Sequence, residues 1–435
     1  MACKNEEGQV LITFVLALGV LMGFAGLAID MGTLRYERRL QQTAADSAAV
    51  AGASNLAFGG VISGAQNASA ANGFKDNGGG QVSNCTSSGA AVGTVCVQVN
   101  NPPASGSHAG NAAYVEVLVA SVQPTYFISV LGIKKATVSA RAVAGNLGRG
   151  PGSGCIYALD PNSDGIEGVN INGNATLYAP QCGILDNGNF NTSGNALTVT
   201  AGTFDVSGTW PEIGKGNVTC TYSSTCPVLG TPLGADPLSY LTPPPKPGTS
   251  FGSVTTSGTQ TLQPGEYSSI TFGKNSTVTL TSGIYYIDGS GGITFNGDST
   301  VTGSGVMFYF TCPSGQTSCS GGPTINATGG GDHLDIELSA QISGPYCGIL
   351  FYQNPIDTTG PSLGGDDNSM FQGALYFPKA EVTFFGNDAF NSTANYTILV
   401  AAAIALSGHP YVTLNSNYSS LPGGVSIIKN STLVE

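Results

Sequence analysis

An uncharged apolar run near the start of the chain restricts what this protein can be more than any other feature. The run covers residues 10–29, where no side chain carries a charge. A helix of that length rises about 30 Å, which matches the hydrocarbon thickness of a bilayer. A soluble core helix rarely stays apolar on every face over such a distance. The run therefore predicts one membrane-spanning helix at residues 10–29, after a cytoplasmic N-terminus at residues 1–9.

The residues before the run do not resemble a cleaved secretory signal, which has a basic leader and a shorter apolar stretch. Here Lys4 stands against Glu6 and Glu7. We therefore expect the helix to stay attached as a membrane anchor in contact with lipid. Gly19 and Gly23 form a GxxxG spacing, which is typical of helix association in membranes. Gly is common in such helices in any case, so simple exposure to lipid is the alternative interpretation.

Helix-forming residues continue beyond the apolar run. Residues 30–58 contain no Pro and are rich in Ala, Leu, Gln and Arg, which predicts that the helix extends as a rod. Residues 59–149 then include stretches that alternate apolar with small polar side chains, as half-buried strands do. They predict a small α+β module. The rod also offers small side chains for close approach to another surface, at Ala44, Ala48, Ala51 and Gly52.

Internal repetition dominates the remainder of the chain, residues 150–435. The phrase ITFGKNSTVTLTSG begins at Ile270 and ITFNGDSTVTGSG begins at Ile293, 23 residues later. A recurring strand–turn unit of about 20 residues is what a β-solenoid requires, because each coil buries its face on the next. We expect a right-handed β-helix, since a β-sandwich would share the composition but not the repeated phrases. The fold class is therefore mainly β with an N-terminal α segment.

A proline-rich segment at residues 241–253 interrupts this pattern. Its four Pro residues cannot lie in a central strand, because Pro removes a ladder hydrogen bond. The segment predicts an exposed loop or a seam between two halves of the solenoid.

Charge is divided unevenly along the chain. Up to residue 149 there are 9 Lys and Arg against 7 Asp and Glu, and beyond it 5 against 19, which together give the net charge of −12. The acidic part would repel phosphate backbones, so nucleic acid is not expected as a partner.

Cysteine spacing indicates an oxidising compartment. Three pairs would close short loops and a fourth brackets one segment, while Cys3 and Cys347 are left over. None has the CxxC spacing of a zinc site. Disulfides persist outside the cytoplasm, so we expect the bulk of the chain there. The expected pairs are Cys85 with Cys96, Cys155 with Cys182, Cys220 with Cys226, and Cys312 with Cys319.

The first third of the chain resembles the TadG-like family of Flp (tight-adherence) pilus-assembly proteins, also grouped as TadE/TadG. The resemblance lies in GLAIDMG at residues 26–32, RRLQQTAADSAAVAGA at residues 38–53, and PTYFISVLG with ATVSARAVAG within residues 124–145. It implies a bacterial envelope protein held by its N-terminal helix, with other pilus-assembly proteins as partners.

The chain departs from related families at two points. Pilins that are cleaved by prepilin peptidase carry Glu five residues after the Gly, whereas Thr13 follows Gly8 at that distance. The metal-binding motif of the von Willebrand A domain, frequent in this family, is missing, and the expected β-helix stands in its place. Arg35, Arg38 and Arg39 after the anchor would favour a cytoplasmic C-terminal side, but that tendency weakens for long translocated domains.

One turn resembles the start of a calcium loop. Asp160, Asn162 and Asp164, followed by Gly165, match the D-x-[DN]-x-[DN]-G opening, but Ile171 occupies the position of the bidentate Glu. A plain Asp/Asn/Gly turn is the alternative, and no other cofactor is expected.

Two acidic clusters raise the question of catalysis. They contain Asp332, His333, Asp335 and Glu337 in one stretch and Asp366 and Asp367 in another. Carbohydrate-active β-helix enzymes use clustered carboxylates with Lys or Arg as a partner, and no Lys or Arg adjoins these acids in the sequence. We therefore expect solvated turn acids and no enzyme.

The sequence thus predicts a single-pass protein of the bacterial cell membrane with its bulk in the cell envelope or at the surface. Its expected role is structural, in Tad/Flp-type pilus assembly or in surface adhesion. Packing in the core is the default interpretation of the late aromatic runs, and contact of their outward side chains with a surface polysaccharide is the alternative. One alternative is a membrane-tethered β-helix carbohydrate-active enzyme, a polysaccharide lyase or hydrolase. Another is a pilin-like filament subunit.

Overall fold

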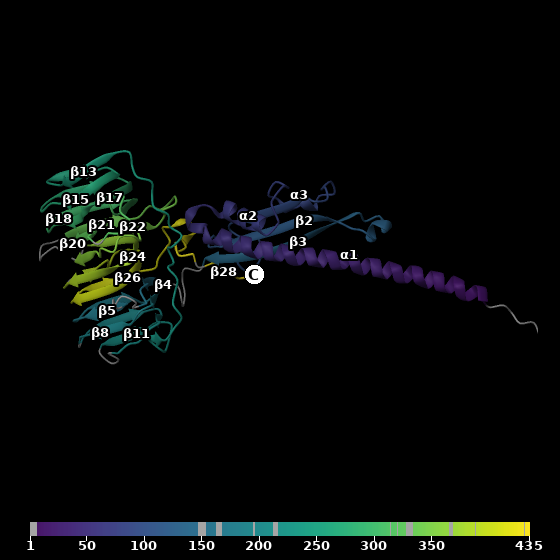
Figure 1. The fold of residues 1–435 in the computed structure, drawn as a ribbon, viewed down its shortest axis with the longest axis horizontal. Coiled ribbons are helices and arrows are strands. Elements are labelled where there is room, and N and C mark those ends of the chain that lie inside the picture. Colours follow the sequence, from purple (N-terminus) through teal and green to yellow (C-terminus); the bar gives the residue numbers. More distant parts are fainter. Residues whose placement is uncertain are drawn as a thin grey trace, which may run out of the picture. The chain divides into compact units, whose positions relative to one another are not determined.

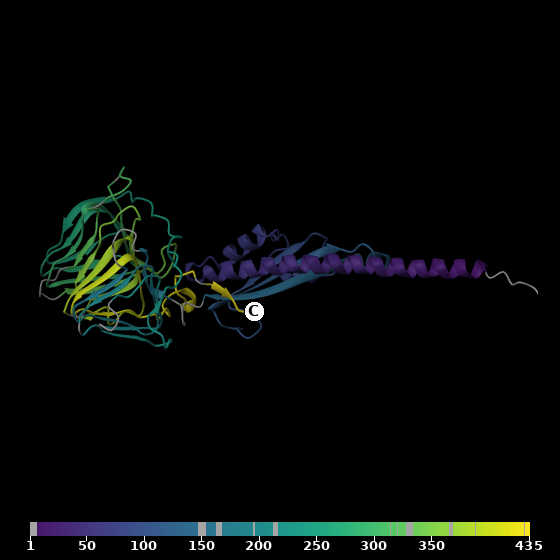
Figure 2. The same cartoon turned by 60° about the horizontal axis from the view of Figure 1, so that its bottom comes forward.

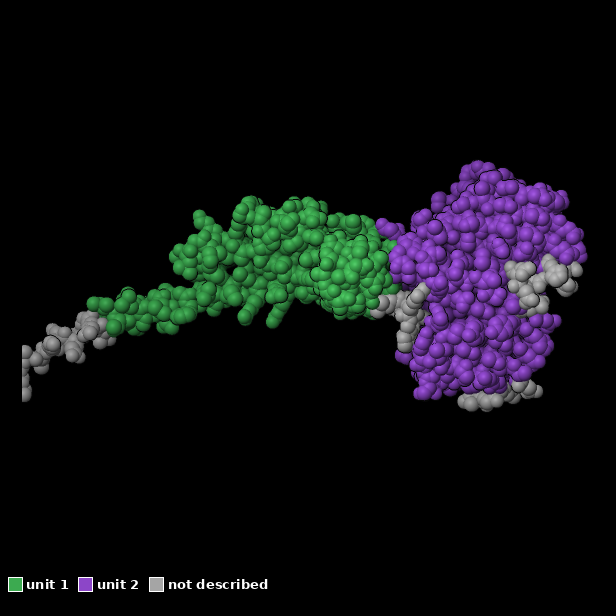
Figure 3. Space-filling model, turned by 180° about the vertical axis from the view of Figure 1, so that it is seen from behind, with its two compact units in different colours: residues 1–56, 60–146, 431–435 green, residues 57–59, 147–430 purple. Residues whose placement is uncertain are grey.

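The chain folds into two compact units, which Figure 3 shows in two colours. The N-terminal unit comprises residues 1–56, 60–146 and 431–435, and the β unit comprises residues 57–59 and 147–430. The computed structural model describes residues 7–146, 154–161, 168–194, 196–211, 216–313, 315–319, 321–327, 334–364, 369–387, 389–429 and 431–435.

The N-terminal unit combines one long helix with an antiparallel sheet. The predicted continuous helix is present as α1, which spans 48 residues, and its first half extends past the sheet in both views (Figure 1, Figure 2). The sheet has the order β1-β2-β3-β28. The elements are α1 (Glu7–Ser54), η1 (Leu56–Phe58, whose last two residues belong to the β unit), α2 (Val61–Ala71), α3 (Val82–Thr86), β1 (Val95–Asn100), β2 (Tyr114–Pro124), η2 (Ile128–Leu131), β3 (Lys135–Asn146) and β28 (Ser431–Leu433).

The second half of α1 packs on this sheet through small side chains. A stripe of alanines is fully buried there, and a Cβ added to Gly52 would lie 3.0 Å from the Val115 side chain. The small residues predicted to allow close approach therefore meet the chain's own sheet, except that Ala51 is only half-buried. The buried stripe consists of Ala44, Ala45, Ala48, Ala49 and Ala53.

The last strand of the chain belongs to the N-terminal unit. β28 pairs antiparallel with β3, with Ser431 opposite Asn146 and Leu433 opposite Ala144. The range 150–435 expected for a single solenoid domain is therefore too long at its end. Three residues give no periodic signal, so the sequence pattern did not indicate this return.

The β unit is built from short strands, and every pairing between its described strands is parallel. They are β4 (Gly154–Ala158), β5 (Val169–Asn172), β6 (Thr176–Ala179), β7 (Gly183–Asp186), β8 (Phe190–Ser193), β9 (Thr198–Ala201), β10 (Phe204–Val206), β11 (Asn217–Cys220), β12 (Val228–Leu229), β13 (Ser250–Thr255), β14 (Thr259–Leu262), β15 (Gly265–Phe272), β16 (Thr277–Leu280), β17 (Gly283–Phe295), β18 (Ser299–Ser304), β19 (Val306–Phe310), β20 (Ile325–Ala327), β21 (Leu334–Ser339), β22 (Ile349–Gln353), β23 (Ser362–Gly364), β24 (Met370–Gly386), β25 (Ala389–Phe390), β26 (Thr397–Gly408) and β27 (Tyr411–Thr413), with a 3₁₀ turn η3 (Pro422–Gly424).

The repeated phrases become register partners in this arrangement. Ile270 of β15 lies opposite Ile293 of β17, and Thr277 of β16 lies opposite Thr300 of β18. The offset of 23 residues is therefore one step between paired strands. Apolar side chains at these positions alternate inward and form one continuous core, as the pleat requires.

The chain enters the stack of strands in its middle. β4 and β5 pair with β26, where Leu399 lies opposite Ile156 and Leu406 opposite Ile171. From β4 the chain proceeds through β7 and β10 to β12, then crosses to the far end at β13 and returns through β15 and β17 to β26. Figure 1 shows this order as yellow strands lying between green and teal ones. The seam between the two halves is thus formed by β26 against β4 and β5.

The proline-rich segment is the connection between the halves rather than the seam itself. Strand β13 already begins at Ser250, so the loop expected at 241–253 ends earlier. Its backbone is held by tyrosines, with Tyr352 Oη donating to Leu241 O at 3.2 Å and Tyr346 Oη to Thr242 O at 3.1 Å. Lys246 at its far end forms ion pairs with Glu266 and Asp288.

Candidate functional site

The first half of α1 is the most unusual surface of the N-terminal unit. Its large apolar side chains point away from the protein, and Phe14 and Phe24 are 63% and 67% exposed. By length and composition this helix can cross a membrane. Exposure of so much apolar area to water costs about 25 cal/mol per Å². This half of α1 is therefore a candidate single membrane span.

The two glycines predicted to support helix association lie on an open face of that half. A Cβ added to Gly19 or Gly23 would have no neighbour within 4 Å. Gly26, one turn further, is different, because its added Cβ would lie 2.6 Å from the Phe127 ring. Helix association through Gly19 and Gly23 stays a prediction, whereas Gly26 is required for a contact within the unit.

The connection between β2 and β3 is fastened to α1 by one buried carboxylate. Asp30 is 1% exposed and accepts hydrogen bonds from the backbone N–H groups of Tyr126, at 3.1 Å, and Ile128, at 2.7 Å. Hydrogen bonds to a charged acceptor are among the stronger ones in proteins. The Asp in GLAIDMG and the segment PTYFISVLG, which are far apart in sequence, therefore form one local structure.

The glutamines of the RRLQQTAADSAAVAGA segment also bind the sheet. Gln41 is fully buried and its amide donates to the Ser121 hydroxyl, while the Gln42 amide donates to Arg141 O at 3.0 Å. Together with the alanine stripe, these contacts explain why this segment needs small and amide side chains.

A carboxylate–guanidinium cluster ties the C-terminal end of the chain to the sheet. Arg141 bridges Glu116, at 2.5 Å, and Glu435, at 2.6 Å. Burial opposes the charge of Glu116, but hydrogen bonds from Asn100 and Arg141 outweigh it and lower its pKa. Hydrogen bonds from Ser107 and Arg141 lower the pKa of Glu435 to about 2. Both acids are therefore charged at neutral pH, and β28 is held by charge as well as by its ladder.

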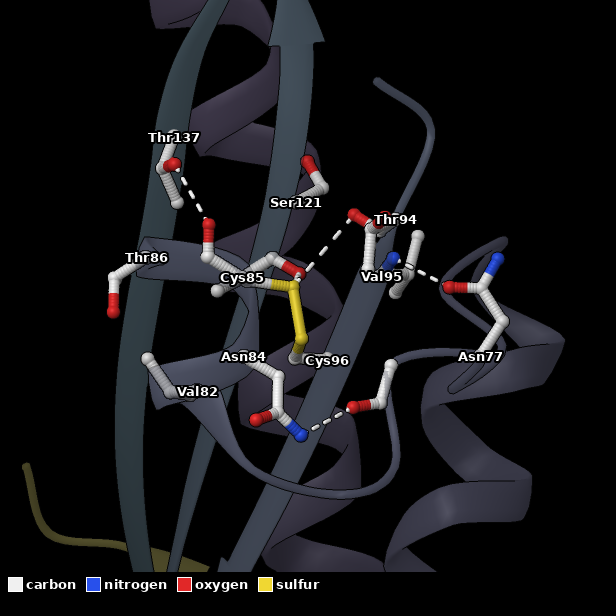
Figure 4. The surroundings of a disulfide bond; sticks show 12 residues. Asn77, Val82, Asn84, Cys85, Thr86, Thr94, Val95, Cys96, Ser121 and Thr137 are labelled. Atoms are coloured by element: carbon white, nitrogen blue, oxygen red, sulfur yellow. Dashed lines mark hydrogen bonds between the residues drawn. A yellow bond between two sulfur atoms is a disulfide. The ribbon is translucent and has the colours of Figure 1, made fainter. Parts of the chain in front are cut away.

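Four disulfides join cysteines within the described residues. Cys85 of α3 joins Cys96 of β1 in the N-terminal unit, next to the hydrogen bond from Thr137 Oγ1 to Cys85 O (Figure 4). Among the described cysteines, Cys347 has no disulfide partner; it is buried, and burial raises its pKa to about 11. The pairs in the β unit are Cys155–Cys182, Cys220–Cys226 and Cys312–Cys319.

The suggested calcium turn is described only in part. Asp160 lies at the start of the loop after β4, two residues beyond Ala158, whereas Asn162 and Asp164 lie outside the described residues. Within the described ranges, no group of three His, Cys, Asp or Glu side chains is arranged to hold a metal ion.

The acidic clusters are likewise divided. Asp335 and Glu337 lie on the outward face of β21, alternating with buried Leu334, Ile336 and Leu338. Their register neighbours on β18 are Thr300 and Thr302, which supply no basic partner. Asp332, His333, Asp366 and Asp367 fall outside the part of the chain that the structure describes.

A cavity of about 800 Å³ in the β unit is lined by charged residues that the sequence analysis did not place in one site. It is lined by Asp160, Asp236, Lys379 and Glu381, among others. Burial raises the pKa of Glu381. These residues come from the loop after β4, the connection between the halves, and a bend in β24. No spacing pattern joins such distant positions, so sequence reasoning had no signal for this cavity.

Comparison with known proteins bears on the N-terminal segment alone. Residues 8–55 match the family model described as putative Flp pilus-assembly TadE/G-like, which confirms the resemblance of that segment. The matched range almost coincides with α1. No curated protein and no solved structure matches the chain.

Proposed function

We propose that this protein is a membrane-anchored structural component of Tad/Flp-type pilus assembly or surface adhesion, with its bulk outside the cytoplasm. The carrying observation is that the family match and the exposed apolar surface fall on the same helix, α1. The first half of α1 would be the anchor, and its second half carries the α+β module. Partners would be other pilus-assembly proteins, as the family suggests.

The β unit would be the presented part, and we infer that it is a right-handed β-helix. Parallel pairing throughout its described strands and the 23-residue step between Ile270 and Ile293 support this fold. Paired strands β14, β16 and β18 place Thr side chains in rows, such as Thr259, Thr277 and Thr300, which suit contact with a surface polysaccharide or a neighbouring envelope protein. Four disulfides favour an oxidising location.

The proposal is tested in a strain that produces the protein and assembles Flp pili. Deletion of the gene is expected to reduce piliation or surface attachment, and the full chain is expected to restore it. A chain in which residues 1–29 are replaced by a cleavable secretory signal keeps the β unit but loses the anchor, and should not restore it. Full restoration by that released version would contradict an anchored role.

The cavity of the β unit supports a second candidate, a tethered carbohydrate-active enzyme. It is lined by Asp160, Asp236 and Glu381 as well as Lys379, and glycoside hydrolysis uses paired carboxylates. The check is release of reducing or unsaturated ends from a panel of acidic and neutral polysaccharides. Activity that Glu381→Gln abolishes would replace the structural proposal, whereas we expect no turnover with either form.

A further inference from the structure

Among the described residues outside α1, the tip of the β2–β3 hairpin carries the most exposed large apolar side chains. Val130 and Leu131 in η2 are 85% and 81% exposed, and Ile133 follows at 56%. Residues 125–133 contain no charged side chain. Hairpin tips in water are normally polar, and a cluster of this kind marks an interaction surface.

The tip lies beside the apolar half of α1. Phe127 packs on Gly26, and Asp30 holds the backbone of the tip through two hydrogen bonds. An apolar groove of about 530 Å³ separates the two elements, lined by Val20, Phe24 and Leu27 of α1 and by Phe127, Val130 and Leu131 of the tip. Figure 1 shows this connection next to the middle of α1.

The position of the groove along α1 determines whether water or lipid surrounds the tip. Residue 20 lies nine residues before the end of the predicted span at residue 29, which corresponds to about 14 Å along the helix axis. The tip shares the groove with Val20, so it reaches well below the end of the apolar run. If α1 crosses a bilayer at residues 10–29, the tip cannot stay in water.

Charged and aromatic residues lie close in sequence to the apolar surface, after Asp30 on α1 and at the ends of the hairpin tip. Lys134 follows the tip, and Arg35 and Arg38 follow Asp30 along α1, all three exposed. Tyr36 and Tyr126 are exposed close to these positions in the chain. Cations and tyrosines at the end of an apolar surface are typical of the lipid headgroup level.

We propose that the β2–β3 tip is a second membrane element, which inserts Val130, Leu131 and Ile133 into the acyl chains of the leaflet that α1 leaves. The groove between tip and helix is filled by lipid chains, and Lys134 and Arg35 contact phosphate groups. The N-terminal unit is thereby attached at two points and cannot swivel about α1. This inference rests on the proposed anchoring of α1.

The test is depth-dependent fluorescence quenching with the full-length protein in vesicles. Leu131→Trp is reconstituted in phosphatidylcholine with phosphatidylglycerol, with and without phosphatidylcholine brominated at mid-chain. Trp210, the single native tryptophan, lies in the β unit and supplies the same baseline in every variant. We expect blue-shifted emission of the added Trp and strong quenching by the brominated chains.

Two matched variants separate the outcomes. Phe14→Trp reports α1 itself, and Ala112→Trp reports the opposite end of the sheet, because β2 runs 11 residues between Tyr114 and Pro124. The proposal predicts quenching at positions 14 and 131 but not at 112. Quenching at 14 without quenching at 131 overturns the proposal and leaves the anchor intact. Absence of quenching at 14 overturns the anchor and this proposal with it.

Vesicles of phosphatidylcholine alone distinguish insertion from attraction to anionic headgroups. Persisting quenching of Leu131→Trp supports acyl-chain insertion. Its loss in the neutral vesicles would show a surface contact through Lys134 and Arg35 only, and would overturn the insertion.

Discussion

The two units of this protein hold their structure in different ways. In the N-terminal unit, single residues make specific contacts, such as Asp30 with the hairpin backbone and Arg141 with Glu116 and Glu435. In the β unit, similar residues repeat in register and bury one another in rows. The first unit contains the segment that a family model matches, whereas no family, curated protein or solved structure was matched by the second. A repeating sequence pattern indicates the fold of the β unit, but it does not determine which residue types form the repeat.

This contrast predicts that the two units tolerate substitution differently. Two spectroscopic probes report the unfolding of each unit separately. Trp210 fluorescence reports the β unit, since its indole is buried there and donates to Thr192 Oγ1 at 3.0 Å. Far-UV circular dichroism at 222 nm reports mostly α1, the longest helix described. Thermal or urea unfolding in detergent can therefore be followed for each unit within one sample.

The largest effect is expected in the core rows of the β unit. Phe308 is fully buried on β19 between Tyr285 and Phe351. Phe308→Ala should destabilise the β unit by about 3–5 kcal/mol, because the cavity cannot be refilled by rigid strands. The Trp210 transition should move and the helix signal should not.

A matched variant at the end of the stack sharpens this prediction. Phe251 on β13 stacks on Tyr267 but is 41% exposed. Phe251→Ala should cost only about 1 kcal/mol, since little area and one aromatic pair are lost. Equal losses at the two positions would contradict a core built from stacked rows.

A second effect in the β unit depends on pH. Asp186 is buried beneath the backbone N–H groups of Val169 and Gly188, and burial raises its pKa to about 6 from 3.8. The unfolded carboxyl ionises first, so the stability of the β unit should fall as pH rises from about 4 to about 6, by up to about 3 kcal/mol.

Asp186→Asn isolates this contribution. Burial also raises the pKa of Asp205, Asp357 and Glu381 in the same unit, so the wild-type curve contains several groups. The difference between wild type and Asp186→Asn should change between pH 4 and 6 and stay flat above it. A difference independent of pH would show that Asp186 is not the titrating group.

The close approach of α1 to its sheet predicts a smaller effect in the N-terminal unit. Ala48 is fully buried in the alanine stripe. Ala48→Leu should cost about 1–3 kcal/mol through overpacking and should shift the 222 nm transition. Thr43→Leu adds a side chain of the same size on the exposed side of the same helix and should be nearly neutral. Similar shifts for both variants would mean that α1 does not pack as described.

The smallest effect is expected where β28 joins the sheet. The Glu435 pKa is lowered to about 2, so its ion pair with Arg141 is complete above its ordinary pKa and is lost as pH falls from about 4.5 towards 2. Glu435→Gln should speed amide hydrogen exchange of residues 431–435 at neutral pH, with little change in either unfolding transition. If exchange there already matches an unstructured peptide in the wild type, β28 is not a stable strand.

Local signals account for what the sequence predicted correctly. The apolar run needed composition only, and the family match on residues 8–55 confirms the resemblance read from its motifs. The repeat at Ile270 and Ile293 predicted a regular step because the chain itself carries the period. The long N-terminal helix and the mainly β remainder followed from these two patterns.

Contacts between distant segments account for what the sequence did not indicate. Leu399 and Ile156 meet at the seam, although neither lies in a repeated phrase that points to the other. The cavity around Glu381 and the return of β28 also depend on pairings across hundreds of residues. The sequence shows that the hairpin tip is apolar, but it does not show that the tip lies close to α1. That closeness is established by the contacts of the tip with Gly26 and Asp30 in the structure.

The most direct test of the central claim is the sidedness of the full-length protein in cells that produce it. Spheroplasts are treated with a protease that cannot cross the membrane, and the membrane fraction is probed with antibodies to the β unit and to a tag before residue 7. A membrane-spanning α1 with an external bulk predicts loss of the β-unit signal and a short tagged fragment that stays in the membrane. A β unit that resists the protease until the membrane is dissolved would contradict this account.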